Sequence, residues 1–161
     1  MTQSNDTRTV MDAIRCIVHA VRVASRTVEK ELGLSGAQLF VLGKLADGKA
    51  TSVNELAQRT LTHQSSVSVV VQKLVKSGLV VSAPSLADGR RVELSLTRKG
   101  RSVIGKSPQA AQEQLIEALE NMPGESRKRL AELLQDFVGR AGIAEEFPAL
   151  LLEDSAGKET S

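Results

Sequence analysis

Residues 62–100 read THQSSVSVVVQKLVKSGLVVSAPSLADGRRVELSLTRKG, and this stretch decides the fold. It opens with helical apolar periodicity, which Gly78 ends because glycine readily takes the left-handed conformation that closes a helix. Two short runs with strand character follow, at 79–81 and 92–96, and a new helix starts at Thr97. A helix, a hairpin and a further helix in this order predict a winged helix-turn-helix, in a protein that is mostly α with a small β-hairpin wing.

The first helix of this stretch, with Thr62 as its expected N-cap, has two unlike faces. At roughly 100° per residue the apolar face holds Val67, Val70, Val71, Leu74 and Val75. The opposite face is polar and basic, which allows close approach to a partner and hydrogen bonds to phosphates or base edges. Val69 is the exception, and its methyl groups either meet a thymine methyl or belong to a scattered surface valine. The polar face and its flanks comprise Ser65, Ser66, Ser68, Val69, Gln72, Lys73 and Lys76, and His63 precedes them as a helix-start or phosphate-contacting residue.

Between the two strands lies the ten-residue loop SAPSLADGRR, residues 82–91, interrupted by Pro84 and by an Asp-Gly pair. Its tip carries Arg90 and Arg91, whose permanently charged guanidinium groups suit a narrow minor groove. Asp88 would repel DNA unless it were paired, so we expect it to hold one of the arginines in place. A hairpin that is merely salt-bridged is the alternative interpretation.

The charge distribution agrees with a DNA-binding surface. The chain has a net charge of only +2, but residues 51–107 hold nine Lys and Arg against three acidic residues. The helix-turn-helix segment therefore carries +6 and the rest of the chain −4. Positive potential concentrated on one segment is the electrostatic signature of phosphate binding.

Two capping boxes predict short helices before this stretch. Ser35 with Gln38 begins one that ends before the Asp-Gly pair at 47–48, and Ser52 with Glu55 begins another that runs to about Thr60. Each pair satisfies free N–H groups at the start of a helix. These helices supply the first part of the helix-turn-helix.

Longer amphipathic segments flank this core. One helix is expected over residues 9–32, one from Thr97 to about Met122 with interruptions at Gly105 and Pro108, and one over 126–139. Their apolar residues exceed what a small winged domain can cover, which indicates self-association. The predicted organisation is a disordered N-terminus (1–8), a winged domain (35–97), a helical dimerisation region (9–34 and 98–152) and a disordered tail (153–161).

Composition limits the number of domains, the kind of core and the cellular location that we expect. The 161 residues suffice for one domain, and a hydrophobic content of 41% with three Phe and no Trp or Tyr means an aliphatic core. No apolar run is long enough to span a bilayer, and the N-terminus lacks a signal-peptide segment, so we expect a cytoplasmic protein without membrane contact. The single cysteine, Cys16, forms no intramolecular disulfide.

The run SSVSVVVQKLVKSGLV, the wing DGRR, the strand VELSLT and the following KG together resemble the multiple antibiotic resistance regulator (MarR) family over roughly residues 10–140. The resemblance implies a homodimer built from the first helix and the last two, bound to double-stranded DNA. It makes Ser65, Ser66, Ser68 and Val69 candidates for base and backbone contacts, with Gln64 and Gln72 near them. Arg90 corresponds to the minor-groove arginine, and Arg91 and Asp88 complete the wing motif.

The resemblance also implies a trigger, either a small phenolic or other aromatic acid or the oxidation of a cysteine. Cys16 lies on the first predicted helix with His19 one turn away, but this chain lacks the tyrosines of the organic hydroperoxide regulators, and an inert thiol is the alternative. It also lacks the tryptophan of the urate-responsive regulators. A cleft between His19, Phe40 and neighbouring aliphatic residues is the predicted effector site.

The leading interpretation is a DNA-binding transcriptional regulator that acts as a repressor. The alternative is a winged helix that serves as a protein-interaction module without specific DNA binding. The sequence contains no recognisable arrangement of nucleophile and base, no phosphate-binding loop and no metal-ligand spacing, so we predict no enzymatic activity, no metal and no cofactor.

Overall fold

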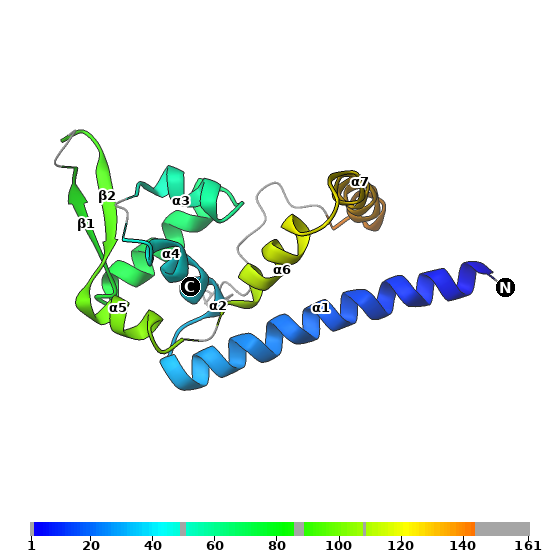
Figure 1. Ribbon diagram of the computed structural model, residues 1–161, viewed down its shortest axis with the longest axis horizontal. Coiled ribbons are helices and arrows are strands. Elements are labelled where there is room, and N and C mark those ends of the chain that lie inside the picture. Colours follow the sequence, from blue (N-terminus) through cyan, green and yellow to red (C-terminus); the bar gives the residue numbers. More distant parts are fainter. Residues whose placement is uncertain (1, 49–50, 86–88, 108, 144–161) are drawn as a thin grey trace, which may run out of the picture.

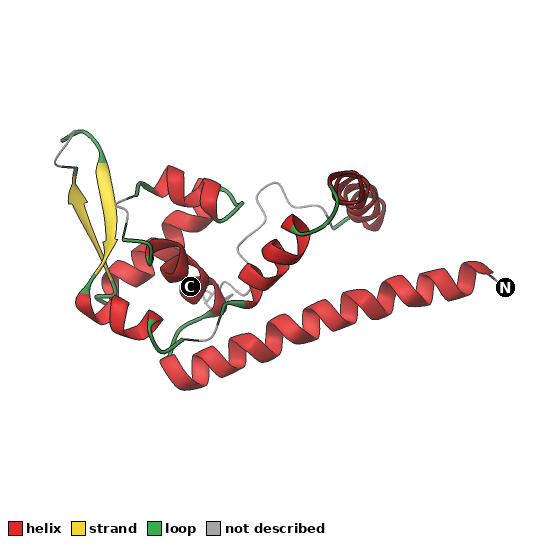
Figure 2. Ribbon diagram, viewed as in Figure 1, coloured by secondary structure: helices red, strands yellow, loops and turns green. Residues whose placement is uncertain are grey.

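The computed structural model describes residues 2–48, 51–85, 89–107 and 109–143, with side chains from residue 5 onward. Within these ranges the chain forms seven helices and one antiparallel hairpin (Figures 1 and 2), so the predicted fold class is confirmed. The elements in order are α1 (Thr2–Leu32), α2 (Gly36–Leu45), α3 (Val53–Arg59), α4 (Gln64–Lys76), β1 (Val80–Pro84), β2 (Val92–Leu96), α5 (Arg98–Ile104), α6 (Ala111–Glu120) and α7 (Gly124–Ala141).

Helix α1 begins at Thr2, so the prediction of disorder over residues 1–8 is wrong for residues 2–8. The hydroxyl of Thr9 donates to the carbonyl of Asn5 at 2.9 Å, which adds a local bond to the first turns. Figure 1 shows that the N-terminal part of α1 extends away from the other elements. Only its C-terminal half, through the buried Val21 and Val28, packs into the molecule.

Both capping boxes form as predicted. In each, the hydroxyl of the first residue accepts from the backbone N–H three positions on, while the side chain there accepts from the backbone N–H of the first residue. The distances are 3.2 and 2.9 Å for Ser35 with Gln38. They are 3.2 and 2.8 Å for Ser52 with Glu55. Sequence-local hydrogen bonds therefore fix where α2 and α3 begin.

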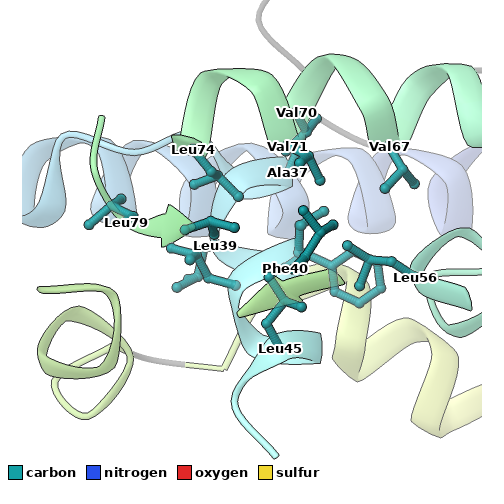
Figure 3. Close-up of a cluster of buried hydrophobic side chains, with 14 of the residues drawn as sticks. Ala37, Leu39, Phe40, Leu45, Leu56, Val67, Val70, Val71, Leu74 and Leu79 are labelled. Carbon is teal, nitrogen blue, oxygen red and sulfur yellow. The ribbon is translucent and has the colours of Figure 1, made fainter. Parts of the chain in front are cut away.

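The core lies where α2, α3, α4 and the hairpin meet (Figure 3). Side chains from α2 and α4 point toward one another in this view, and Leu79 closes the end of the cluster next to the hairpin. Burying one such aliphatic side chain contributes about 1.5–3 kcal/mol, which makes this cluster the main source of stability in the winged domain. Its most completely buried large side chains are Phe40, Leu42, Leu45, Leu56, Leu74 and Leu94.

The start of α4 differs from the prediction by one residue. His63, not Thr62, is the N-cap, and its side chain makes no capping hydrogen bond. Leu61 takes a positive φ of 54° and the backbone N–H of Thr62 donates to the carbonyl of Ala57 at 3.0 Å. This backbone angle and this hydrogen bond keep Thr62 in the turn that ends α3, so α4 starts after His63.

The hairpin pairs β1 with β2 in the register Val80↔Leu96 to Pro84↔Val92. The predicted loop of residues 82–91 is therefore too long, because Pro84 lies inside β1. Proline is tolerated there because an edge strand leaves one row of N–H groups unused. On the other side of β2, Thr51 exchanges backbone hydrogen bonds with Leu94 at 2.8 and 3.3 Å, which attaches the hairpin to the segment before α3.

The segment after the hairpin divides in two, as the interruptions at Gly105 and Pro108 predicted. Helix α5 contacts α2 and β2, and its Val103 and Ile104 pack against the core. Helix α5 therefore belongs to the winged domain, and the boundary expected at residue 98 lies after it instead. The final helix, α7, is longer than the predicted 126–139 and has no buried residue. The expected tail, 153–161, and the rest of 144–161 lie outside the described residues.

Candidate nucleic-acid interface

The outward face of α4 is mostly as the helical wheel predicts. His63, Gln64, Ser65, Gln72 and Lys76 are exposed, and Ser68 and Lys73 are half-buried. Val69 is 44% exposed, so an apolar side chain does stand on this polar surface. The face combines short hydroxyls and amides with two lysines and is able to contact both phosphates and base edges.

Two residues of α4 lie differently from the prediction. Ser66 is buried, because it is next to Val67 and Val70 on the inner side of the helix, so it does not belong to the exposed face. Val75, expected in the core, is 39% exposed at the C-terminal end of α4. The helix is thus rotated slightly relative to the wheel, toward Ser66 and away from Val75.

The C-terminal end of α4 is joined to the start of α5. Gly78 takes a φ of 71°, and its carbonyl accepts from the hydroxyl of Thr97 at 2.8 Å. The Lys99 ammonium donates to the carbonyl of Ser77 at 3.1 Å. Gly100 lies so close to Leu79 that an added Cβ would meet its carbonyl oxygen at less than 3.0 Å. These contacts fix the orientation of α4 relative to the hairpin.

At the wing, Arg90 and Arg91 are both exposed, and the carbonyl of Arg91 accepts from the backbone N–H of Ser85 at 2.7 Å. The predicted partner, Asp88, lies outside the described residues. A different carboxylate interacts with the wing. The pKa of Glu55 is lowered, first by its hydrogen bond from the backbone N–H of Ser52 and, among smaller effects, by the positive charge of Arg91.

The predicted effector residues do not form one cleft. Cys16 and His19 are exposed on α1, whereas Phe40 is 1% exposed and belongs to the core. A cleft of about 510 Å³ opens instead between α2, the end of α3 and the start of α6. Its walls hold two cations, Lys44 and Arg59, and the other lining residues are Leu39, Phe40, Gly43, Ala46, Ile104, Ser107, Gln109, Ala110 and Glu113.

Comparison with known proteins decides the family. The family model described as MarR family matches residues 32–91, the part that holds α2, α3, α4 and the hairpin. Residues 32–91 thus have the sequence of a MarR-family domain. The chain is a transcriptional regulator of the MarR type.

Relatives span most of the length of this chain. The homoprotocatechuate degradative operon repressor of Escherichia coli is 22% identical over 121 residues, which cover 75% of this chain and 82% of the repressor. The transcriptional regulator BldR of Sulfolobus solfataricus is 25% identical, with a TM-score of 0.54 over 87% of this chain and 99% of that one. A mutant MarR of E. coli solved with operator DNA is 20% identical, with a TM-score of 0.56 over 83% and 96% of the two chains, and shares the fold.

Sequence reasoning missed two features of this part of the structure. In the sequence, nothing marks the link between Thr51 and β2 except that Thr51 is β-branched, and the cleft is formed by residues far apart in the chain.

Among the described residues no group of three or more His, Cys, Asp or Glu could hold a metal ion. None of the described helices is long and apolar enough to cross a membrane.

Proposed function

We propose that the chain is a dimeric, sequence-specific DNA-binding repressor. The observation that supports this most directly is the exposed polar and basic face of α4, with the arginine-bearing hairpin in the same domain. Helix α4 is 13 residues long, a length that fits a major groove, and the hairpin would reach the adjacent minor groove. In this proposal Gln64, Ser65, Ser68, Val69 and Gln72 meet base edges or the backbone. His63, Lys73 and Lys76 meet phosphates.

The wing supplies the first test. Arg90→Ala is expected to weaken operator binding strongly, because it removes a guanidinium from the minor groove. The logarithm of the affinity should also fall linearly with that of the salt concentration, with a slope that reports the phosphates neutralised. Mobility shifts with the intergenic DNA upstream of the gene measure both. Equal affinity of wild type and variant at all salt concentrations would exclude the wing from the interface. Absence of any specific shift by the wild type would favour a protein-interaction module.

Exposed apolar side chains of the terminal helices support the proposed dimer. Ile17 of α1 and Leu133, Leu134 and Phe137 of α7 are between 40% and 58% exposed in the single chain. Exposed apolar surface on terminal helices is typical of a subunit interface. Leu134→Glu should convert a dimer to a monomer in sedimentation experiments. The exposed control Glu132→Gln should not.

The effector site of this proposal is the cleft beside α2. Its volume of about 510 Å³ lies within the range of roughly 300–1,000 Å³ of small-molecule sites, and its two cations suit the carboxylate of an aromatic acid. Sodium benzoate is the simplest probe. Release of operator DNA by millimolar benzoate, but not by the same concentration of sodium chloride, supports this class of effector, and no release argues against it.

Oxidation of Cys16 is the alternative trigger, supported by the exposure of this thiol. Peroxide should then release operator from the wild type and leave Cys16→Ser bound. Equal responses of the two proteins would exclude this residue as the sensor.

A further inference from the structure

The winged domain and the C-terminal helices meet through little apolar surface. Helix α6 has no buried residue; Ala110, just before it, and its own Ile116 pack partly against the core, and α6 also contacts α1. Apolar contacts of this kind have no preferred direction. A directional contact would fix the rotation of α6 relative to α2 more narrowly than these apolar contacts do.

One ion pair supplies that contact. The Lys44 ammonium on α2 lies 2.6 Å from a carboxylate oxygen of Glu113 on α6, across 69 positions of sequence. The side chains are 18% and 33% exposed, so solvent screens this pair less than a surface pair. The same ammonium lies 5.4 Å from the centroid of the Phe40 ring, whose buried position restrains the lysine.

We propose that the Lys44–Glu113 pair is a latch that holds the winged domain in the orientation required for DNA binding. The proposal rests on the function proposed above. A binding surface that is already oriented loses less freedom when it binds, so opening the latch weakens operator affinity. Both residues also line the cleft, and an anion that pairs with Lys44 there would separate it from Glu113.

The chain offers a matched control. Arg59 and Asp47 form an ion pair of 2.8 Å with side-chain exposures of 33% and 39%, and Arg59 lines the same cleft. Both members of this control pair belong to the winged domain. Breaking it with Asp47→Asn removes a similar interaction without releasing α6.

The test measures operator affinity by fluorescence anisotropy for Lys44→Gln, Glu113→Gln, their combination and Asp47→Asn. Each latch variant should bind about twofold to fivefold more weakly, the effect of one such interaction. The double variant should be no weaker than the weaker single variant, because both changes break one pair. Asp47→Asn should stay within twofold of the wild type. Unchanged or tighter binding by both latch variants, or fully additive losses, would overturn the latch.

A second measurement needs no DNA. Hydrogen exchange in residues 109–115 should be faster in Glu113→Gln than in the wild type and unchanged in Asp47→Asn, because only the first releases α6. Exchange unchanged in Glu113→Gln would overturn the latch even if its affinity falls. If the wild type binds no operator but exchange rises in Glu113→Gln, the proposed function fails while the restraint on α6 stands.

Discussion

Replacing Gly100 with alanine tests the junction between α4, the hairpin and α5. The new methyl carbon would lie closer than 3.0 Å to the Leu79 carbonyl oxygen, 3.2 Å from its carbonyl carbon and 3.3 Å from Cδ2 of Leu96. Backbone atoms do not move aside as a flexible side chain does. Overpacking of this kind costs about 1–3 kcal/mol. The Leu79 carbonyl also accepts the backbone N–H of Thr97 at 3.0 Å, and losing that bond adds about 0.5–1.5 kcal/mol.

We therefore expect Gly100→Ala to lower the free energy of unfolding by about 2–4 kcal/mol, measured by urea denaturation followed by circular dichroism. Gly43→Ala is the matched control, because Gly43 lies in α2 and a methyl group added there would meet no atom within 4 Å beyond the adjacent backbone of its own helix. That change should stabilise the chain by about 0.5–1 kcal/mol through the helix propensity of alanine. Equal stabilities of the two variants would refute the argument from close approach.

Three further predictions concern the winged domain. Leu74→Ala should lower the free energy of unfolding by about 2–5 kcal/mol, because Leu74 is fully buried. Val75→Ala should lower it by less than about 1 kcal/mol, because Val75 is 39% exposed. Equal losses of stability in urea denaturation would contradict the observed rotation of α4. Ser35→Ala should lower stability by about 1 kcal/mol, since it removes the acceptor that caps α2, and an unchanged midpoint would count against the cap. The pKa of Glu55 is lowered in the folded chain, so its ionised form stabilises the fold at pH values above the carboxyl's unfolded pKa of about 4.3. The wild type should therefore be more stable than Glu55→Gln at pH 7, and this difference in unfolding free energy should disappear as the pH falls through the lowered pKa. A constant difference in unfolding free energy between pH 7 and pH 3 would show that the charge of Glu55 has no such effect.

The parts of the fold that depend on neighbouring residues could be predicted from the sequence. Both capping boxes, the stop at Gly78 and the hairpin follow from residues a few positions apart, and the structure contains each of them. The N-cap of α4 could not be predicted, because it depends on how the chain leaves α3 at Leu61.

The exposed face of α4 could be predicted except for Ser66, whose burial depends on how α4 is rotated against α2 and α3. The cleft and its ion pair were beyond the sequence, since Lys44 and Glu113 carry no pattern that relates them. Charge and periodicity thus indicate surfaces, whereas contacts between distant segments require the folded chain.

Helix α7 has 18 residues and buries none of them within its own chain. Most helical stability in proteins comes from the packing of an apolar face, so in the proposed dimer this helix would depend on association for its stability. In the proposed dimer, folding of α7 is therefore second order in protein concentration, and dilution would unfold it while the winged core stays intact. At low copy number the concentration of dimers able to occupy a two-part operator would fall faster than the total protein concentration, which makes the regulator responsive to its own abundance.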